Sequence, residues 1–230
     1  MMYGLRGKPL AYARPSKSAS RYFAANDRLT VHTLEAVYGR ESSFGVLLRN
    51  RGSTGAAGHF HLEARTARRY GLSVSRKNDQ RFDIDRSSSA AARYLKDLDS
   101  MLSKSTVLGN SRTIAVRDVS ERYKFVLGAY NAGEGRIAKA QSFAQREGGN
   151  PQLWADVQRF LEQAWADPRK AKETREYVEA VSIYELQFTS KSPAKDRKQK
   201  KKRERKHSCA DGHWVTIDDR PVFICDRKSV

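Results

Sequence analysis

Residues 91–102 read Ala-Ala-Arg-Tyr-Leu-Lys-Asp-Leu-Asp-Ser-Met-Leu, with apolar side chains recurring every three or four positions. This period is close to the 3.6 residues of a helical turn, so the apolar groups share one face of an amphipathic helix. Asp85 lies ahead of the stripe and is the expected N-cap, because its short carboxylate can accept hydrogen bonds from free backbone amides. The face is formed by Ala91, Tyr94, Leu95, Leu98, Met101 and Leu102.

Other segments repeat this helical spacing. A shorter helix near residues 63–70 is expected to end at Gly71, because glycine readily adopts the left-handed C-cap conformation. We find no alternating apolar run long enough for a sheet before residue 210. Residues 29–188 are therefore predicted to form a mostly α-helical domain. Its remaining helices are expected at 119–130, at 150–164 with Leu153 and Phe160 facing inward, and at 177–188.

The chain changes character after this domain. Lys191–Lys206 holds ten Lys or Arg residues and two acidic ones, and such a segment cannot offset the entropy of folding by burying apolar groups. We therefore expect a solvated basic linker over residues 189–210. Two short apolar runs follow, His213–Ile217 and Pro221–Ile224, and they predict a β-hairpin tail within residues 211–230.

Two cysteines, Cys209 and Cys225, bracket the expected hairpin. They can pair as a disulfide in an oxidising compartment, or join His207 and His213 in a small zinc site whose spacing matches no standard zinc finger. Unpaired thiols are the default interpretation. Two cysteines are in any case too few for a disulfide-stabilised scaffold.

The composition is strongly basic. The 230 residues contain 44 Lys and Arg against 26 Asp and Glu, which gives a formal net charge of +18. This surplus implies an anionic partner, such as nucleic acid, acidic lipid or a cell-wall polymer. No apolar run approaches the roughly 18 residues that span a bilayer, which excludes an integral membrane protein.

The first 28 residues are basic as well. No acidic residue precedes Asp27, whereas Arg and Lys occur five times before it. The segment lacks the apolar core of about 7–15 residues that characterises a secretory signal. Residues 1–28 are therefore interpreted as a basic N-terminal arm.

Glu41 is the first candidate for chemistry. It follows Leu34, Val37 and Tyr38 on one helical face, so it is expected at the end of an otherwise apolar stripe. Apolar neighbours raise the pKa of a carboxyl group, which suits a general acid at neutral pH. The alternative is a solvated glutamate at a helix terminus.

Three more segments have functional and structural interpretations. Gly55–His61 is rich in small residues, which permit close approach of a ligand or simply form a tight loop. In Ala129–Gly135, Tyr130 and Asn131 can present an aromatic ring and an amide to a sugar, or merely end a helix. Glu173–Val178 is expected to open the last helix, with its acid near the positive end of the helix dipole.

In this order the four segments resemble the soluble lytic transglycosylases, enzymes of the lysozyme-like superfamily that includes goose-type lysozyme. The family pattern has a Glu-Ser pair, a glycine-rich segment ending Gly-x-x-Gln, an Ala-Tyr-Asn-Ala-Gly segment and a helix beginning Glu-Thr-Arg-x-Tyr-Val. This chain has Glu41-Ser42, Gly55 to His61, Ala129 to Gly133 and Glu173 to Val178. Four ordered motifs over residues 29–188 are far more specific than any one of them.

The resemblance implies a lysozyme-like fold and cleavage of the β-1,4 bond between N-acetylmuramic acid and N-acetylglucosamine in peptidoglycan. Most glycosidases use two carboxylates, whereas lytic transglycosylases need one. Glu41 would protonate the glycosidic oxygen and then, as a base, take the proton of the muramoyl 6-hydroxyl to give a 1,6-anhydro product, with no cofactor. The implied substrate-binding residues are Ser42, His61, Tyr130, Asn131 and Glu173.

The chain departs from the family pattern at the end of the glycine-rich segment. His61 stands where the family usually has glutamine, and His59 precedes it by two residues. A histidine can donate to a sugar hydroxyl as an amide does, but it also titrates near neutrality. The two histidines suggest a metal site only weakly, because no third ligand is evident.

Two rival functions stay open. One is a hydrolysing muramidase, in which a second acid such as Asp79, Asp83 or Asp85 activates water. The other is a non-catalytic basic protein on the same scaffold, because a fold alone does not establish a function.

The resemblance also implies a partner and a location. The substrate would be peptidoglycan glycan strands, and Lys191–Lys206 would anchor the protein to anionic envelope polymers. Nucleic acid is the weaker alternative, because no nucleic-acid motif accompanies the basic run. The enzyme would act in the periplasm or cell envelope, and the absence of a signal segment favours a phage-borne enzyme or one delivered by a secretion machine.

Overall fold

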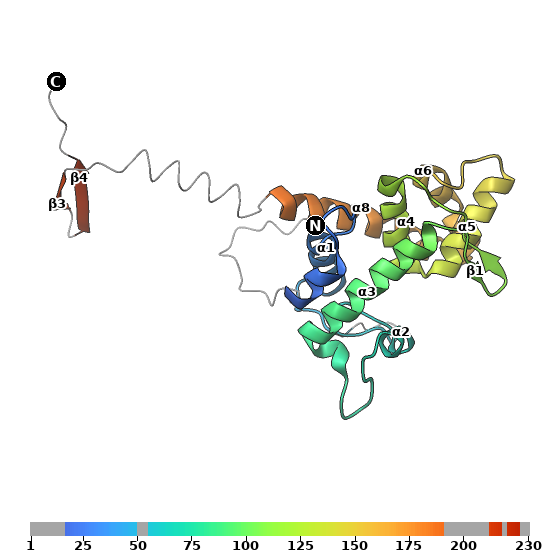
Figure 1. Ribbon diagram of the computed structural model, residues 1–230, viewed down its shortest axis with the longest axis horizontal. Helices are drawn as coiled ribbons and strands as arrows, with labels where there is room; N and C mark the ends of the chain where they lie inside the picture. Colours follow the sequence, from blue (N-terminus) through green and yellow to red (C-terminus); the bar gives the residue numbers. More distant parts are fainter. Residues whose placement is uncertain (1–16, 50–54, 191–211, 218–219, 226–230) are drawn as a thin grey trace, which may run out of the picture. The chain divides into compact units, whose positions relative to one another are not determined.

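The computed structural model describes residues 17–49, 55–190, 212–217 and 220–225 (Figure 1). The chain divides into two compact units, residues 1–188 and 189–230. The predicted linker run Lys191–Lys206 lies outside the described residues, and so does Cys209.

The first unit is built from helices, which confirms the predicted mostly α-helical class. None of the described helices is long and apolar enough to cross a membrane. The α-helices are α1 (Val31–Ser42), α2 (Ala64–Arg69), α3 (Ile84–Leu102), α4 (Val119–Ala132), α5 (Glu134–Arg146), α6 (Trp154–Val157), α7 (Leu161–Trp165) and α8 (Pro168–Ser190). Short 3-10 helices are η1 (Lys17–Tyr22), η2 (Gln80–Phe82) and η3 (Gln158–Phe160).

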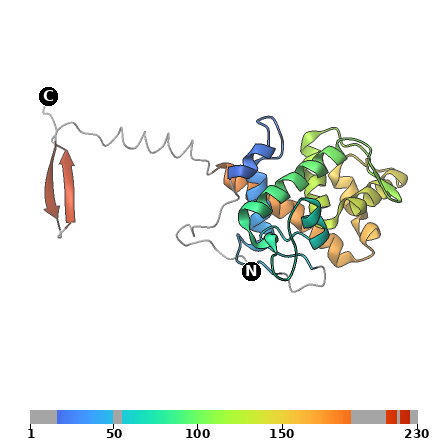
Figure 2. The ribbon, with the colours of Figure 1, turned by 60° about the horizontal axis from the view of Figure 1, so that its bottom comes forward.

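Helix α3 runs through the middle of this unit and packs most extensively on α4 (Figures 1 and 2). The predicted apolar face of α3 forms part of the core, where Leu95, Leu98 and Leu102 are fully buried. Its N-cap is Asp83 rather than the predicted Asp85, because the Asp83 carboxylate accepts a hydrogen bond from the backbone amide of Arg86. Asp85 lies within the first turn.

The region before residue 29 is not simply an arm. Residues 17–22 form η1, which packs against α3, and Ala19 is fully buried. The Asp27 carboxylate is held 2.7 Å from Lys96 Nζ on α3. The described part of the predicted arm therefore belongs to the helical unit, while residues 1–16 lie outside the description.

The predicted helix at 150–164 is broken into α6, η3 and α7. Asn150 forms a turn first, because its side chain accepts a hydrogen bond from the Gln152 amide, and Leu153 is 42 % exposed rather than inward. Helix α8 begins at Pro168, five residues before the predicted start, and a proline is well suited to a first helical position.

Two small sheets complete the structure. Strands β1 (Val107–Leu108) and β2 (Ser111–Arg112) pair antiparallel in a hairpin too short to leave an alternating pattern in the sequence. In the second unit, β3 (Gly212–Ile217) and β4 (Arg220–Cys225) pair antiparallel, which confirms the predicted hairpin.

At Gly58 two backbone segments approach each other very closely. Its φ is +84°, and a Cβ at this position would lie only 2.0 Å from the carbonyl oxygen of Arg81. The Gly58 amide donates to the Leu48 carbonyl at 2.7 Å, and the next amide, of His59, donates to the Arg81 carbonyl at 3.1 Å. Only glycine fits this crossing, as expected from the small residues of this segment.

We therefore expect Gly58→Ala to destabilise the protein by about 3 kcal/mol, because it combines a strained φ with a clash against backbone. Gly135→Ala is the matched control, since a Cβ there meets nothing within 4 Å and lies in a helix. The control should be stabilising by up to about 1 kcal/mol. Urea denaturation monitored by circular dichroism measures both, and equal effects would contradict the account of Gly58.

Candidate active site

Glu41 lies in the last turn of α1, at the end of the predicted apolar stripe. Leu34, Val37 and Tyr38 of that stripe are buried, and the Glu41 side chain is only 14 % exposed. The helix is fixed at its start by Thr30, whose hydroxyl accepts hydrogen bonds from the His32 and Thr33 amides. The backbone of α1 therefore holds the carboxyl group at a defined place.

A buried carboxylate on α8 also secures the start of α1. The Glu185 carboxylate lies 2.9 Å from the Arg28 guanidinium and also accepts a hydrogen bond from the Thr33 hydroxyl. These contacts connect the segment before α1 and its first turn to α8. They matter for the site because α8 also supplies two residues that act on Glu41.

Burial raises the pKa of Glu41 from 4.5 to about 7. Interaction with the Tyr177 hydroxyl and the charge of Arg40 favour the carboxylate and limit the rise, whereas the negative charge of Glu173 adds to it. Because burial outweighs the favourable partners, a large fraction of Glu41 is protonated at neutral pH. This is the protonation state that a general acid needs.

Two tyrosines face this carboxyl group from different helices. The Tyr130 hydroxyl of α4 donates to the Phe60 carbonyl at 3.0 Å, and its ring stacks on Tyr177 of α8 with a centroid separation of 6.5 Å. Burial and the charge of Glu41 hold the pKa of both phenols well above the usual value. Both therefore stay protonated and act as hydrogen-bonding groups.

Tyr177 was not among the predicted site residues, because the sequence places it in the apolar stripe of the last helix. Apart from its interaction with Glu41, its buried hydroxyl has no hydrogen-bond partner in the described part of the chain. A signal was available, because Tyr177 lies four residues after Glu173, one helical turn along the same face.

Ser42 is buried and does not present its hydroxyl to solvent. Its Oγ lies 2.8 Å from the His59 carbonyl and 3.2 Å from the Tyr38 carbonyl, and it accepts a hydrogen bond from the Gly45 amide at 3.0 Å. These bonds join the end of α1 to the loop over residues 55–63. Ser42 therefore positions this loop relative to Glu41.

The same loop is held from its other side by Arg81, whose guanidinium is buried. It donates to the Gly55 and Leu62 carbonyls at 2.7 and 3.0 Å, and it forms an ion pair with Asp79 at 2.7 Å. The loop thus has a fixed backbone on both flanks, and His61 extends from it toward Glu41.

The His61 ring lies between Glu41 and a backbone carbonyl. Its Nδ1 is 3.6 Å from Glu41 Oε2, and its Nε2 donates to the Leu47 carbonyl at 2.8 Å. Burial lowers the pKa of His61 below 6.5, an effect that the Leu47 carbonyl partly offsets. His59 points elsewhere, since its Nε2 donates to the Phe82 carbonyl at 3.1 Å. No group of three potential metal ligands occurs among the residues that the structure describes.

Asn131 and Glu173 lie near this centre on α4 and α8. The Asn131 side-chain oxygen accepts a hydrogen bond from Thr174 at 2.9 Å, which leaves its amide NH2 as a donor. Glu173 is 49 % exposed and pairs with Lys170 at 2.9 Å. The structure therefore brings His61 and Tyr130 to the carboxyl group of Glu41. Glu173 acts on this carboxyl group through its negative charge.

None of the three candidate second acids is among the groups that shift the pKa of Glu41. Asp79 is paired with Arg81, which lowers its pKa. Asp83 caps α3, and Asp85 is exposed in the first turn of that helix. The charge of Glu173, in contrast, raises the pKa of Glu41.

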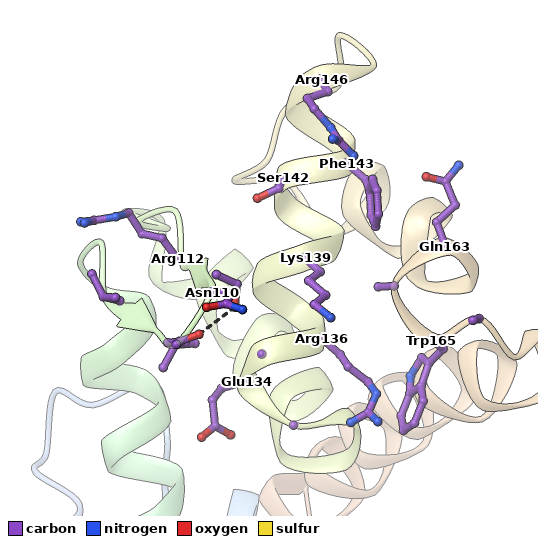
Figure 3. A pocket seen from close by; sticks show the side chains of 18 residues that line it. Asn110, Arg112, Glu134, Arg136, Lys139, Ser142, Phe143, Arg146, Gln163 and Trp165 are labelled. Carbon is purple, nitrogen blue, oxygen red and sulfur yellow. Dashed lines mark hydrogen bonds between the residues drawn. The ribbon is translucent and has the colours of Figure 1, made fainter.

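A basic groove of about 1410 Å³ lies at the α4–α5 corner, where Gly133 and Glu134 follow the end of α4 (Figure 3). The β1–β2 hairpin, α5 and α7 form its walls. The Arg136 guanidinium lies over the Trp165 ring at 3.8 Å from its centroid. Four cations line the groove, and none has an ion-pair partner among the described residues: Arg112, Arg136, Lys139 and Arg146.

Comparison with known proteins places this site in a family. Residues 18–152 match the family model described as the transglycosylase SLT domain. Two similar proteins are both named membrane-bound lytic murein transglycosylase F. The one from Cronobacter sakazakii is 31 % identical over 131 residues, covering 57 % of this chain and 22 % of the relative. The one from Salmonella choleraesuis is 30 % identical over 151 residues, covering 66 % and 26 %.

The matched region contains Glu41, the loop over residues 55–63 and the end of α4, whereas Glu173 and Tyr177 lie beyond it. This chain spans about a quarter of the length of these curated relatives. The family model, however, matches more than half of the chain. The chain therefore belongs to the transglycosylase SLT domain family.

Proposed function

We propose that this protein is a peptidoglycan lytic transglycosylase of the cell envelope, with Glu41 as its single acid/base residue. The observation that carries the proposal is the buried Glu41 carboxyl, whose pKa is raised to about 7. The names of the similar proteins, lytic murein transglycosylases, support the same substrate class.

In the proposed reaction, protonated Glu41 gives its proton to the glycosidic oxygen as the bond from that oxygen to C1 of N-acetylmuramic acid breaks. The leaving N-acetylglucosamine thus gains a hydroxyl, and the substrate acetamido group helps to stabilise the positive charge at C1. The Glu41 carboxylate then removes the proton of the 6-hydroxyl, and O6 bonds to C1. Glu41 ends protonated, and no water enters the product.

The neighbours support this cycle in different ways. The parallel rings of Tyr130 and Tyr177 are part of the buried surroundings of the carboxyl group, and this burial sustains its raised pKa. The Asn131 amide is a suitable donor to the acetamido oxygen, and Glu173 is a supporting carboxylate. Ser42 acts indirectly in this scheme, because its hydroxyl is committed to the loop backbone.

A hydrolysing muramidase needs a second carboxylate to activate water. Asp79 is held in an ion pair with Arg81, and Asp83 serves as a helix cap. Neither carboxylate is among the groups that shift the pKa of Glu41. These contacts favour the one-carboxylate reaction over hydrolysis.

We expect Glu41→Gln to lower the release of muropeptides from purified peptidoglycan by about 10²–10⁴-fold, because it removes the acid and the base together. Mass spectrometry should find 1,6-anhydromuramoyl ends in the wild-type digest. Glu179→Gln is the matched control, since Glu179 is an exposed glutamate on α8, and it should retain wild-type activity. Reducing ends, heavier by one water, would identify a hydrolase instead, and unchanged activity of Glu41→Gln would refute its role.

The basic groove supports a second, non-catalytic function, which is binding to the cell wall. We propose that it holds an anionic envelope polymer, because its cations are unpaired in the described residues and only Glu134 among its lining residues is acidic. Such contacts are electrostatic and are weakened by salt. They would retain the enzyme on the wall beside the site of cleavage.

The charge-reversed variant Lys139→Glu/Arg146→Glu should bind peptidoglycan sacculi about tenfold more weakly at low salt, because it reverses two of the four cations. Co-sedimentation in a Glu41→Gln background avoids digestion of the sacculi. Arg65→Glu/Arg76→Glu makes the same charge change at exposed positions outside the groove and should bind normally. An equal loss in both variants would mean that net charge, and not the groove, sustains binding.

A further inference from the structure

The His61 ring contacts Glu41 on one side and makes one strong hydrogen bond to the backbone on the other. Its Nε2 is 2.8 Å from the Leu47 carbonyl oxygen, which can only accept a hydrogen bond. The hydrogen of the neutral ring is therefore on Nε2, and Nδ1 carries a lone pair. That lone pair is on the nitrogen 3.6 Å from Glu41 Oε2.

The loop backbone holds the ring in this orientation. His61 has a φ of +41°, in the left-handed region that non-glycine residues rarely adopt, and its amide donates to the Gly58 carbonyl at 3.3 Å. The preceding carbonyl, of Phe60, is held by the Tyr130 hydroxyl at 3.0 Å. Strained backbone that persists beside a reactive group is typical of functional sites.

We propose that His61 is a positioning residue for the acid proton of Glu41. In the neutral ring, Nδ1 accepts a hydrogen bond from the protonated Glu41 carboxyl group. When the ring is protonated, Nδ1 can no longer accept this bond, and activity is lost at low pH. This inference rests on the proposed function. The gap of 3.6 Å is slightly longer than a hydrogen bond, and such contacts often shorten when substrate binds.

The charges around the pair define the two limits of activity. A protonated His61 places a positive charge beside Glu41, adding to that of Arg40 and favouring the carboxylate, which cannot act as an acid. Glu173 on α8 opposes this effect, while Tyr130 and Tyr177 remain neutral. Activity should therefore fall below the titration of His61 and above that of Glu41.

The test compares pH–rate profiles for anhydromuropeptide release between pH 4.5 and 8. The wild-type rate should fall progressively on the acid side of its maximum, because His61 becomes charged there. His61→Gln introduces the amide side chain that the family usually has here and removes the titrating group, so its profile should stay flat on the acid side. The matched control is His32→Gln, which removes the other described histidine–glutamate contact of α1, to Glu35, and should keep the wild-type profile.

A second measurement does not depend on activity. Long-range 1H–15N spectra of histidine-labelled protein, with His61 identified from the spectrum of His61→Gln, report which ring nitrogen carries the hydrogen. The proposal requires the Nε2–H tautomer at pH 7 and a shift in the His61 titration in Glu41→Gln. An Nδ1–H tautomer, or an unshifted titration, would overturn it.

The two proposals fail in different ways. If the wild type releases no anhydro product at any pH, the proposed function fails, and the spectra still decide the contact between His61 and Glu41. If the wild type is active and His61→Gln shows the same acid limb, the proposal for His61 alone is wrong.

Discussion

The carboxyl group of Glu41 is buried among apolar and aromatic side chains, and the free energy of its ionisation there constrains the rest of the site. A pKa of about 7 in the folded protein, against 4.5 for an ordinary glutamate, corresponds to about 3 kcal/mol. Below pH 4.5 the group is protonated in both states and carries no penalty. As the pH rises from 4.5 through 7, the free energy of unfolding decreases, because the unfolded chain ionises this group more readily than the folded one. The burial of Glu41 is therefore most destabilising at pH values where the group is ionised.

The surrounding structure offsets this cost by fixing every element that meets at the carboxyl group. Glu185 joins α1 to α8, the Gly58–Arg81 crossing fixes the loop that carries His61, and Tyr130 connects that loop to α4. Each connection is made by a buried hydrogen bond, an ion pair or a backbone crossing that tolerates no side chain. A site of this kind is rigid before substrate arrives, which favours stabilisation of developing charge.

Much of this arrangement could be predicted from the sequence, because its signals are local. The apolar stripes predict the helices, and the neighbours of Glu41 predict its burial. The small residues of Gly55–His61 predict a close backbone approach. Helix ends were harder to place: Asp83 and Asp85 are chemically equivalent caps, and only the path of the chain selects Asp83.

The contacts that complete the site could not be predicted, because they join residues far apart in the sequence. Tyr177 has the spacing of a core residue, and only the packing of α8 against α4 brings its hydroxyl to Glu41. Likewise, the Leu47 carbonyl that sets the hydrogen position on His61 is a backbone group without any sequence signature. Local patterns single out Glu41, whereas the folded chain determines which groups surround its carboxyl group.

The most direct test of this account is an NMR titration of the Glu41 side-chain carboxyl carbon in protein labelled with 13C-glutamate, assigned with Glu41→Gln. The buried site predicts a midpoint near pH 7. A midpoint near 4.5, that of an exposed glutamate, would show that the carboxyl group is ionised at neutral pH and would contradict its role as the resting acid.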